Sequence, residues 1–562
     1  MSRFNLLEEP WIPVMADDMG STEEVSLIEL FLNAHKYKQL AGEMQMQNFA
    51  ILRLLLAVLH TVFSRFDARG EPYPYLALDE KFRQLQEVDE DDLEEHEENL
   101  MATWEALWNR RSFPEIVVEY LHKWKEHFYL FDDRHPFYQV TKEELLKRRI
   151  KAGRGSNPTQ IWPRTFNRTI SESGNKIALF SPRYESDGNK DIIIERELAR
   201  WLVLYQGVVG TGDKAVYEEF KGTNSKGWIY DIGGIALRGK NLYETLLLNL
   251  VLVHPEENYR TSIQKPCWEY TGEEIIDNLL KGYVVDNLAE LYTNWSRAIY
   301  IEPEAELDEN FYISTVKLPE INHQDQFLEP MTLWRYNTQG PNKDHFTPRK
   351  HTMNASFWRS FGTVFLTKES NNKRPGIVDW FYKIAKIAGE TEAVFESYGM
   401  ESDGNATSWL PVDEYFDFLD INEFVLADVQ EDGWVARIDR EVETAKEVIE
   451  NVLRRFVNEV KRIRNIDNND YVNKLIQKAY YSIDQPFRHW LNSLKVNQDK
   501  DERIKQWRLE LRDIVRKQAD FLVQSAGNRD YKGIYDKDKL FSNIALAYNQ
   551  FDYSLNKTLG FF

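Results

Sequence analysis

Residues 442–463 have the sequence VETAKEVIENVLRRFVNEVKRI, and this stretch decides the fold of the C-terminal part of the chain. Apolar side chains recur along it every three or four residues, and charged residues occupy many of the positions between them. A repeat close to 3.6 residues predicts an amphipathic helix that buries one face. The apolar positions are Val442, Ala445, Val448, Ile449, Val452, Leu453, Phe456, Val460 and Ile463.

The residues after this helix keep the same pattern as far as the C-terminus. Four long helices joined by short polar loops are typical of a four-helix bundle. We therefore predict a C-terminal four-helix bundle over residues 421–562, in which the aromatic side chains of the apolar faces form the core. The further helices are expected at about 468–494, 501–524 and 537–559, with polar breaks around 497–499 and at 527–530.

The preceding residues, 1–420, have a less regular pattern. Short apolar runs alternate with turns from about 241 to 424, without a regular succession of strands and helices. Helices are expected at 44–66 and 191–206, where apolar residues recur near the helical spacing. These features predict an α+β fold, in which a large irregular mixed α/β N-terminal domain, 1–420, precedes the bundle.

The composition limits the class of protein. Of the 562 residues, 42% are hydrophobic, which is enough to bury a sizeable core and excludes wholesale disorder. The mean hydropathy is −0.55, and we expect no apolar run of the roughly 18 to 20 residues that span a membrane. The first residues lack the charged and apolar regions of a secretory signal. We therefore expect a soluble, cytoplasmic protein that does not contact a membrane.

The chain has a single cysteine, Cys267. One cysteine excludes an intramolecular disulfide framework, a CxxC redox pair and a Cys-rich structural zinc site. A buried free thiol is therefore expected at this position.

The net charge is strongly negative, but it is unevenly distributed. The chain has 91 Asp and Glu against 70 Lys and Arg, a formal net charge of −21, which argues against nonspecific coating of nucleic acid. Nine of the twelve residues 87–98 are acidic. We expect this run to be a solvated loop and the start of a helix, and the alternative is a decoy for a basic partner.

The sign of the charge reverses between Lys147 and Arg183. This stretch has nine Lys and Arg and one acidic residue, together with glycine, proline and three aromatic residues. Glycine and proline predict a loop, the charge favours a polyanion, and aromatic rings can stack on unpaired bases. Two interpretations remain open, a loop that contacts RNA or DNA and a disordered surface loop.

A glycine-rich turn, GVVGTGDK at 207–214, follows directly on the helix expected at 191–206. It is not a nucleotide-binding phosphate loop, because Gly-Asp-Lys replaces the required Gly-Lys-Ser/Thr and a helix precedes it where a strand is required. Glycines would allow backbone amides to approach a nucleic-acid groove closely, and Lys214 would neutralise a phosphate. The alternative is a helix C-cap followed by a flexible loop.

Catalytic motifs are few. The eleven histidines form no HExxH pair, and no Gly-x-Ser-x-Gly or kinase signature is present. The nearest approach to a metal site is Asp132, Asp133 and His135, although Arg134 among them would oppose a divalent cation. We expect no enzyme, no metal and no cofactor, and the alternative is a stand-alone metal-dependent nuclease that uses these three residues.

Several short motifs follow one another along the chain: Asn5-Leu6-Leu7, Trp11-Ile12-Pro13-Val14, His135-Pro136-Phe137-Tyr138-Gln139, Ser173-Gly174-Asn175, Ala178-Leu179-Phe180, the glycine turn, Trp268-Glu269 and Trp295-Ser296-Arg297. In their order and spacing, these motifs resemble the CasA family, the large subunit of the type I-E CRISPR Cascade surveillance complex. They span nearly the whole chain and precede the expected bundle. The resemblance implies a non-catalytic ribonucleoprotein subunit for antiviral defence, which recognises the protospacer-adjacent motif (PAM) in double-stranded DNA, helps open the duplex and recruits the Cas helicase-nuclease. Its implied partners are the other Cascade subunits, the crRNA 5′ handle and double-stranded target DNA.

The resemblance also implies which residues contact nucleic acid. The family's lysine finger corresponds to Lys317, and its duplex-splitting wedge carries Asn405 where the family example has glutamine, a shorter amide. The PAM and DNA contacts implied in this way are Gly207, Gly210, Thr211, Gly212, Lys214, Lys317, Gly404, Asn405 and Ala406. The loop that anchors the subunit at the crRNA end corresponds to about Ser173–Pro182, with the residues Ser173, Gly174, Asn175, Lys176 and Phe180.

Overall fold

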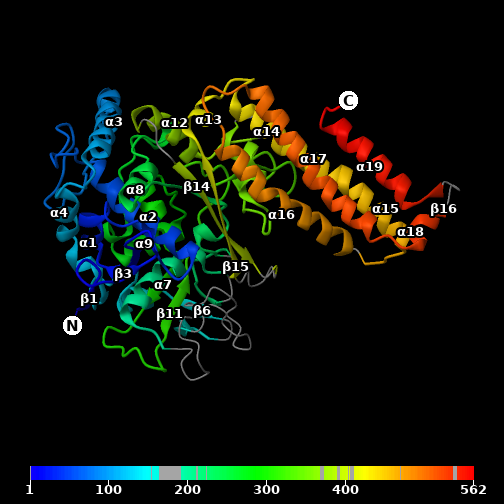
Figure 1. The fold of residues 1–562 in the computed structure, drawn as a ribbon. Helices are drawn as coiled ribbons and strands as arrows, with labels where there is room; N and C mark the ends of the chain where they lie inside the picture. The colour runs from blue at the N-terminus through cyan, green and yellow to red at the C-terminus, as the bar shows by residue number, and fades with distance from the viewer. Residues whose placement is uncertain are drawn as a thin grey trace. The chain divides into compact units, whose positions relative to one another are not determined.

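The structure is a computed structural model in two compact units (Figure 1). The first unit comprises Met1–Ala355 and Thr367–Phe418, and the second comprises Ser356–Leu366 and Leu419–Phe562. The sequence placed the boundary at residue 420 and assigned Ser356–Leu366 to the first domain, whereas this segment belongs to the second unit. The described residues are 2–152, 155–163, 192–210, 213–222, 225–366, 372–388, 393–402, 404, 411–468, 470–535 and 541–562.

Helices and short strands alternate irregularly along the first unit, which confirms the α+β prediction. Its helices are α1 (Leu27–Asn33), α2 (Gln45–Phe63), α3 (Leu93–Arg110), α4 (Ile116–Lys123), α5 (Lys142–Leu146), α7 (Glu195–Val208), α8 (Leu242–Asn249), α9 (Gly272–Lys281), α10 (Leu288–Tyr292) and α12 (Gly376–Ala388). The strands up to the second unit are β1 (Arg3–Asn5), β2 (Ile12–Met15), β3 (Thr22–Val25), β4 (Gln39–Leu40), β5 (Tyr129–Phe131), β6 (Ile150–Ala152), β7 (Thr159–Ile161), β8 (Ala215–Tyr217), β9 (Gly234–Arg238), β10 (Arg297–Tyr300), β11 (Ile313–Lys317), β12 (Trp334–Tyr336), β13 (Phe346–Pro348), β14 (Ala393–Ser402) and β15 (Pro411–Ile421).

Helix α2 is the central core helix of the first unit. Its length and composition would allow it to cross a membrane, with a mean hydropathy of 1.5, so the expectation that no such run exists was wrong. However, 94% of that window is buried inside the fold, as in the core helix of a globular domain. The N-terminus of α2 has no side-chain cap of its own, and the Glu414 carboxylate of β15 accepts from Gln45 N (3.2 Å) and Met46 N (3.0 Å) in its place.

We expect Glu414→Ala to lower the free energy of unfolding of the first unit by about 1–2 kcal/mol, because two buried amides at the start of α2 lose their acceptor. Glu105→Ala, at an exposed position of α3, is the matched control and should change stability by less than about 0.5 kcal/mol. Urea unfolding followed by tryptophan fluorescence measures both. Equal effects of the two variants would contradict the capping role.

The sheet that matters for the candidate site has the strand order β10-β11-β8-β6, and β7 pairs with β11 beside β8. β11 is antiparallel to β10 and β7 and parallel to β8. The register places Arg297 of β10 directly opposite Lys317 of β11. A separate sheet has the order β15-β14-β9.

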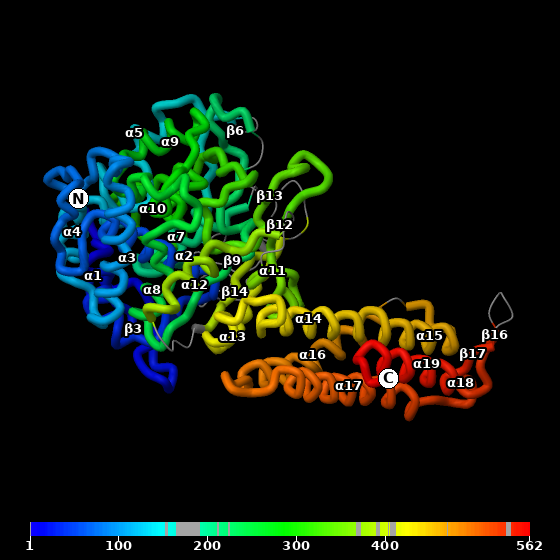
Figure 2. Tube along the Cα trace, turned by 90° about the horizontal axis from the view of Figure 1, so that it is seen from above, coloured from blue at the N-terminus to red at the C-terminus, as the bar shows by residue number. Residues whose placement is uncertain are grey.

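The second unit confirms the four-helix bundle. α14, the π-helical segment η8 and α15 form one continuous helix over the predicted stretch 442–463 (Figure 2), and the apolar stripe of that stretch is buried. α15 packs on α16 and α19, and α17 packs on α16 and α19. The elements are α11 (Phe361–Phe365), α13 (Glu423–Ala427), α14 (Trp434–Glu447), η8 (Val448–Leu453), α15 (Arg454–Arg464), α16 (Asp470–Asn492), α17 (Lys500–Gln524), α18 (Asn528–Lys532), β16 (Ile534–Tyr535), β17 (Phe541–Ser542) and α19 (Ile544–Thr558).

The last helix of the bundle begins later than expected. The sequence predicted a helix from about 537, but β16 and β17 pair as antiparallel strands before it. Asn543 then caps α19, because its side chain accepts from Leu546 N at 2.9 Å. The helix therefore begins at Ile544.

Candidate nucleic-acid interface

The candidate site is built on the C-terminal end of α7, whose buried face includes Leu198, Trp201 and Leu202. Gly207 lies in the last turn of this helix and not in the loop, where the sequence placed it. A Cβ atom on Gly227 would lie 2.2 Å from the Gly207 carbonyl oxygen, and Gly227 N donates to Val209 O at 3.0 Å. Glycine at 227 therefore allows the two backbones to pack closely. A Cβ atom on Gly207 would lie 2.7 Å from Ile229 Cδ1, so Gly207 is a packing residue here.

The side-chain amide of Gln206 fastens α7 to β10. Its Oε1 accepts from Ser296 N and Arg297 N, both at 2.9 Å, and its Nε2 donates to Arg297 O at 2.9 Å. Ser296 Oγ donates to Gln206 O at 2.7 Å. The amide thus pairs with the edge of the strand as another strand would, which fixes where α7 ends relative to the sheet.

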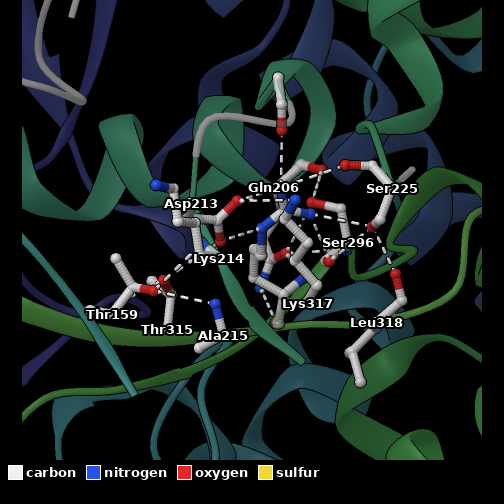
Figure 3. A network of polar contacts seen from close by, with 12 residues as sticks. Thr159, Gln206, Asp213, Lys214, Ala215, Ser225, Ser296, Thr315, Lys317 and Leu318 are labelled. Carbon is white, nitrogen blue, oxygen red and sulfur yellow. Dashed lines mark hydrogen bonds and ion pairs between the residues drawn. The ribbon is translucent and has the colours of Figure 1, made fainter. Parts of the chain in front are cut away.

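Arg297 is the centre of a polar network, and Figure 3 shows its partners Asp213, Ser225 and Ser296. Its side chain is fully buried, and its donors tie together the glycine turn, the segment after residue 224 and the start of β10. The bonds are Nε to Asp213 Oδ2 (2.7 Å), Nη2 to Asp213 Oδ1 (2.8 Å), Nη2 to Gly210 O (2.6 Å), Nη2 to Ser225 O (3.1 Å), Nη1 to Ser225 Oγ (3.0 Å) and Nη1 to Ser296 O (2.8 Å). Arg297 therefore binds the glycine turn at two positions, Gly210 and Asp213.

Lys317 lies in the same cluster. Its Nζ is 3.8 Å from Asp213 Oδ1, and its side chain is 6% exposed. Burial lowers the pKa of Lys317 and Asp213 opposes that shift, while the nearby Arg297 adds to it. The cluster thus has two cations and one carboxylate.

Lys214, the next residue after Asp213, is exposed. Its backbone N–H and that of Ala215 point toward Thr159 Oγ1, at 3.4 and 3.1 Å, so β7 supports the start of β8. The structure therefore brings Gly210, Lys214 and Lys317 together around one network, and Gly207 lies beside it at the end of α7.

Of the other residues implied by the resemblance, the structure describes Gly404 alone. Gly404 follows β14 with an open surrounding and a φ of +72°, a left-handed conformation that favours glycine. Thr211, Gly212, Asn405, Ala406, Ser173, Gly174, Asn175, Lys176 and Phe180 lie outside the described residues.

The basic stretch 147–183 is only partly described, and the loop prediction was wrong for part of it. β6 and β7 lie within it, because their backbones pair with β8 and β11. Lys147 forms an ion pair with Glu273, and Arg148 forms one with Asp277. These two cations are therefore already balanced by carboxylates of α9.

The alternative metal site is not assembled in the structure. The Asp132 carboxylate accepts from Ser2 Oγ (2.6 Å), Arg134 N (3.0 Å) and His135 N (2.6 Å). Burial acts to raise the pKa of Asp132, but these hydrogen bonds outweigh it and the pKa is lowered. Among the described residues, no group of three or more His, Cys, Asp or Glu side chains could hold a metal ion. Asp132 instead caps a local turn.

Sequence reasoning missed Asp213 and Ser225, and it quoted Arg297 only as part of a motif. Asp213 is adjacent to a glycine turn, which is a weak signal, and its partner Arg297 is 84 residues away in the chain. The single cysteine, Cys267, is buried as expected, and burial raises the pKa of its thiol to about 12.

The comparisons with known proteins agree with this fold. A family model described as CRISPR-associated protein Cse1 matches residues 5–518. The CRISPR-associated protein CasA/Cse1 of Thermus thermophilus is 26% identical over 372 residues, which are 65% of this chain and 60% of that relative. The match therefore spans less than two thirds of the length of this curated relative.

Solved structures of similar proteins share the fold over the whole chain. The crystal structure of Thermobifida fusca Cse1 has a TM-score of 0.74 at 23% identity and covers 100% of this chain and 98% of its own. The crystal structure of CasA from Thermus thermophilus has a TM-score of 0.64 at 19% identity, with full coverage of both chains. A chain of a structure titled CRISPR RNA-guided surveillance complex has a TM-score of 0.62 at 15% identity and covers 99% of this chain and 100% of its own. The resemblance to CasA is thus confirmed by a family match over most of the sequence, and the chain belongs to the CRISPR-associated protein Cse1 family.

Proposed function

We propose that this chain is the large subunit of a type I-E CRISPR Cascade complex that recognises the PAM in double-stranded DNA. It helps open the duplex for crRNA pairing and recruits the Cas helicase-nuclease. Its partners are the other Cascade subunits, the crRNA 5′ handle and target DNA, and it binds nucleic acid without cutting it. Family membership supports the assignment to Cascade.

The proposal of PAM recognition rests on one observation: hydrogen bonds and an ion pair connect the glycine turn to Lys317. Arg297 binds Gly210 O and Asp213, and Asp213 is the ion-pair partner of Lys317. A minor groove presents few distinguishing donors and acceptors, so a closely packed backbone turn with one lysine suits tolerant recognition of several related motifs. The cluster has the parts that such recognition needs.

The wedge in this proposal is the segment between β14 and β15 that contains Gly404, Asn405 and Ala406. Separating a base step costs a few kcal/mol, which backbone contacts and guide pairing offset. The anchoring loop for the crRNA end is Ser173–Pro182, which supplies an aromatic side chain, Phe180, for stacking on an unpaired base.

We expect Lys317→Ala and Asn405→Ala each to weaken binding of PAM-bearing duplex by reconstituted Cascade about tenfold, because each removes one polar contact to DNA. Complex assembly should be unchanged. Fluorescence anisotropy measures binding, and size-exclusion chromatography measures assembly. Lys240→Ala, at an exposed lysine of the same unit, is the control and should bind as the wild type does.

Two results would overturn the proposal. If the wild-type chain does not co-assemble with the other Cascade subunits and crRNA, the subunit assignment is wrong. If the purified chain alone cleaves duplex DNA with a divalent metal, and Asp132→Ala abolishes the cleavage, the chain is a nuclease. Normal binding by both variants would contradict the residues assigned to DNA contact.

A further inference from the structure

Arg297 and Lys317 form a buried pair of like charges. They lie directly opposite each other on antiparallel strands, and their side chains are 0% and 6% exposed. Two cations facing each other across a strand pair destabilise the sheet, and burial deprives them of the water that would stabilise their charge. The pair therefore needs a negative charge nearby.

Asp213 supplies that charge, but it holds the two cations unequally. Its two carboxylate oxygens accept from the Arg297 guanidinium at 2.7 and 2.8 Å, a bidentate geometry. Oδ1 is 3.8 Å from Lys317 Nζ, which is an ion-pair distance longer than a hydrogen bond. The Asp213 carboxylate, whose side chain is 2% exposed, therefore interacts more strongly with Arg297 than with Lys317.

This difference makes Lys317 the exchangeable cation of the cluster. If the Lys317 ammonium turns to an external acceptor, Asp213 stays paired with Arg297, and Arg297 still holds Gly210 O and Ser225 O. If Arg297 moved instead, the turn would lose its donors and a buried carboxylate would lose its main partner. Lys317 can therefore change partner while the glycine turn keeps its position.

We propose that Asp213 is a specificity-determining residue of the glycine turn, because its carboxylate keeps Lys317 from binding the phosphates that every duplex offers. Lys317 leaves the carboxylate only for an acceptor held at the right place in a minor groove. The inference rests on the proposed function and adds to it a residue that suppresses binding to the wrong sequence. An unopposed lysine would bind any phosphate and raise sequence-independent affinity.

Asp213→Asn tests this role, because asparagine keeps the size of the side chain and one oxygen acceptor for Arg297 but removes the charge. The probe is a set of duplexes randomised at the base pairs beside a fixed target, bound by Cascade reconstituted with the full chain. We expect the weakly bound duplexes to bind about tenfold tighter, with a salt dependence steeper by about one ion, so that the preference between motifs shrinks. Unchanged preference would overturn the inference.

Glu256→Gln is the matched control, since it removes one negative charge from the ion pair with Lys373 in the same unit. It should leave the preference between motifs as it is in the wild type. If Glu256→Gln reduces the preference as much as Asp213→Asn does, net charge alone sets it and the inference is wrong.

Lys317→Gln is a second variant that leaves the Asp213–Arg297 pair intact, so it tests the inference even if Asp213→Asn does not fold. We expect it to weaken binding of the best-bound duplexes about tenfold and that of the others less than about twofold. An equal loss for all duplexes would overturn the inference but leave Lys317 as a DNA contact. No loss for any duplex would contradict both this inference and the proposed contact.

Discussion

Replacing Glu269 by alanine is expected to lower the free energy of unfolding of the first unit by about 3–5 kcal/mol. Glu269 and Arg65 form an ion pair whose side chains are 1% and 0% exposed, with Nη1–Oε1 at 2.8 Å and Nη2–Oε2 at 3.1 Å. The Tyr120 hydroxyl also donates to Glu269 Oε1 at 2.7 Å. Burial acts to lower the pKa of Arg65, but Glu269 more than compensates and the pKa is raised. Without Glu269, a charged guanidinium would remain buried and unbalanced.

Two comparisons isolate the cause of that loss. Glu302→Ala removes an exposed partner of Lys142, 3.5 Å away, and should cost less than about 1 kcal/mol. The double variant Arg65→Met/Glu269→Leu should recover much of the loss, because it replaces the whole pair by apolar side chains. Urea unfolding measures all three. If Glu269→Ala unfolds at the wild-type midpoint, the pair does not support the core.

The helices with a sustained apolar stripe were predictable from the sequence, because that pattern is local. The stretch 442–463 and the helix at 44–66 both form where the spacing placed them. In 442–463 the residues that recur every three or four positions are those that pack inward, whereas in α2 nearly every residue is buried, including Arg53 and His60. The beginning of α19 was not predictable, because the pairing of β16 with β17 removes residues that a helical pattern would have included.

The candidate site was predictable only in part. The turn after α7 and Lys317 were identified, but the Asp213–Arg297 pair depends on a sheet register that brings together residues 84 positions apart. Gly207 was assigned to a DNA loop, whereas its lack of a side chain makes room for the Ile229 side chain, and Gly227 packs on its backbone. A glycine in a sequence indicates close approach, but the neighbouring backbone decides what approaches it.

The distribution of charge explains why local ion pairs matter at the proposed DNA contact. Residues 419–562 have 24 Lys and Arg and 24 Asp and Glu, so the whole net charge of −21 belongs to residues 1–418. The glycine turn and Lys317 lie in this acidic part. If these residues contact DNA as proposed, the attraction depends on a few local cations, because the net negative charge of residues 1–418 opposes a general attraction to DNA.

Acidification from about pH 7 to about pH 5 is expected to destabilise the first unit by several kcal/mol, through five histidines whose pKa is lowered from 6.5 to about 4. Two of them are His127 and His351, and the other three lie together. His60, His96 and His254 line one cavity of about 30 Å³. Burial lowers the pKa of each from 6.5 to about 4. Their rings bond neutral groups: His60 Nδ1 to Leu56 O at 2.8 Å, His254 Nε2 to Leu328 O at 3.1 Å, and His96 Nδ1 to the Tyr75 hydroxyl at 2.9 Å.

The sign of the effect follows from where protons bind. Above pH 6.5 these histidines are neutral in both the folded and the unfolded chain, so their contribution to stability is fully present. As the pH falls from 6.5 toward 4, the unfolded chain binds protons that the folded chain cannot accept, and stability is lost. Each histidine contributes a slope of at most about 1.4 kcal/mol per pH unit, and the five together at most about 7.

Urea midpoints measured across this pH range test the prediction. His96→Gln and His254→Gln, which stay neutral at every pH, should each reduce the slope by about a fifth, because five histidines contribute to it. The bundle is an internal control, because residues 419–562 contain a single histidine, His489, and its unfolding should depend less on pH. The prediction is contradicted if the stability of the first unit does not change over this pH range, or if both variants keep the wild-type slope. Either result would mean that the histidines around the cavity bind protons in the folded chain. Tight burial of the three rings against one small cavity, with neutral partners on each, is what makes that outcome costly.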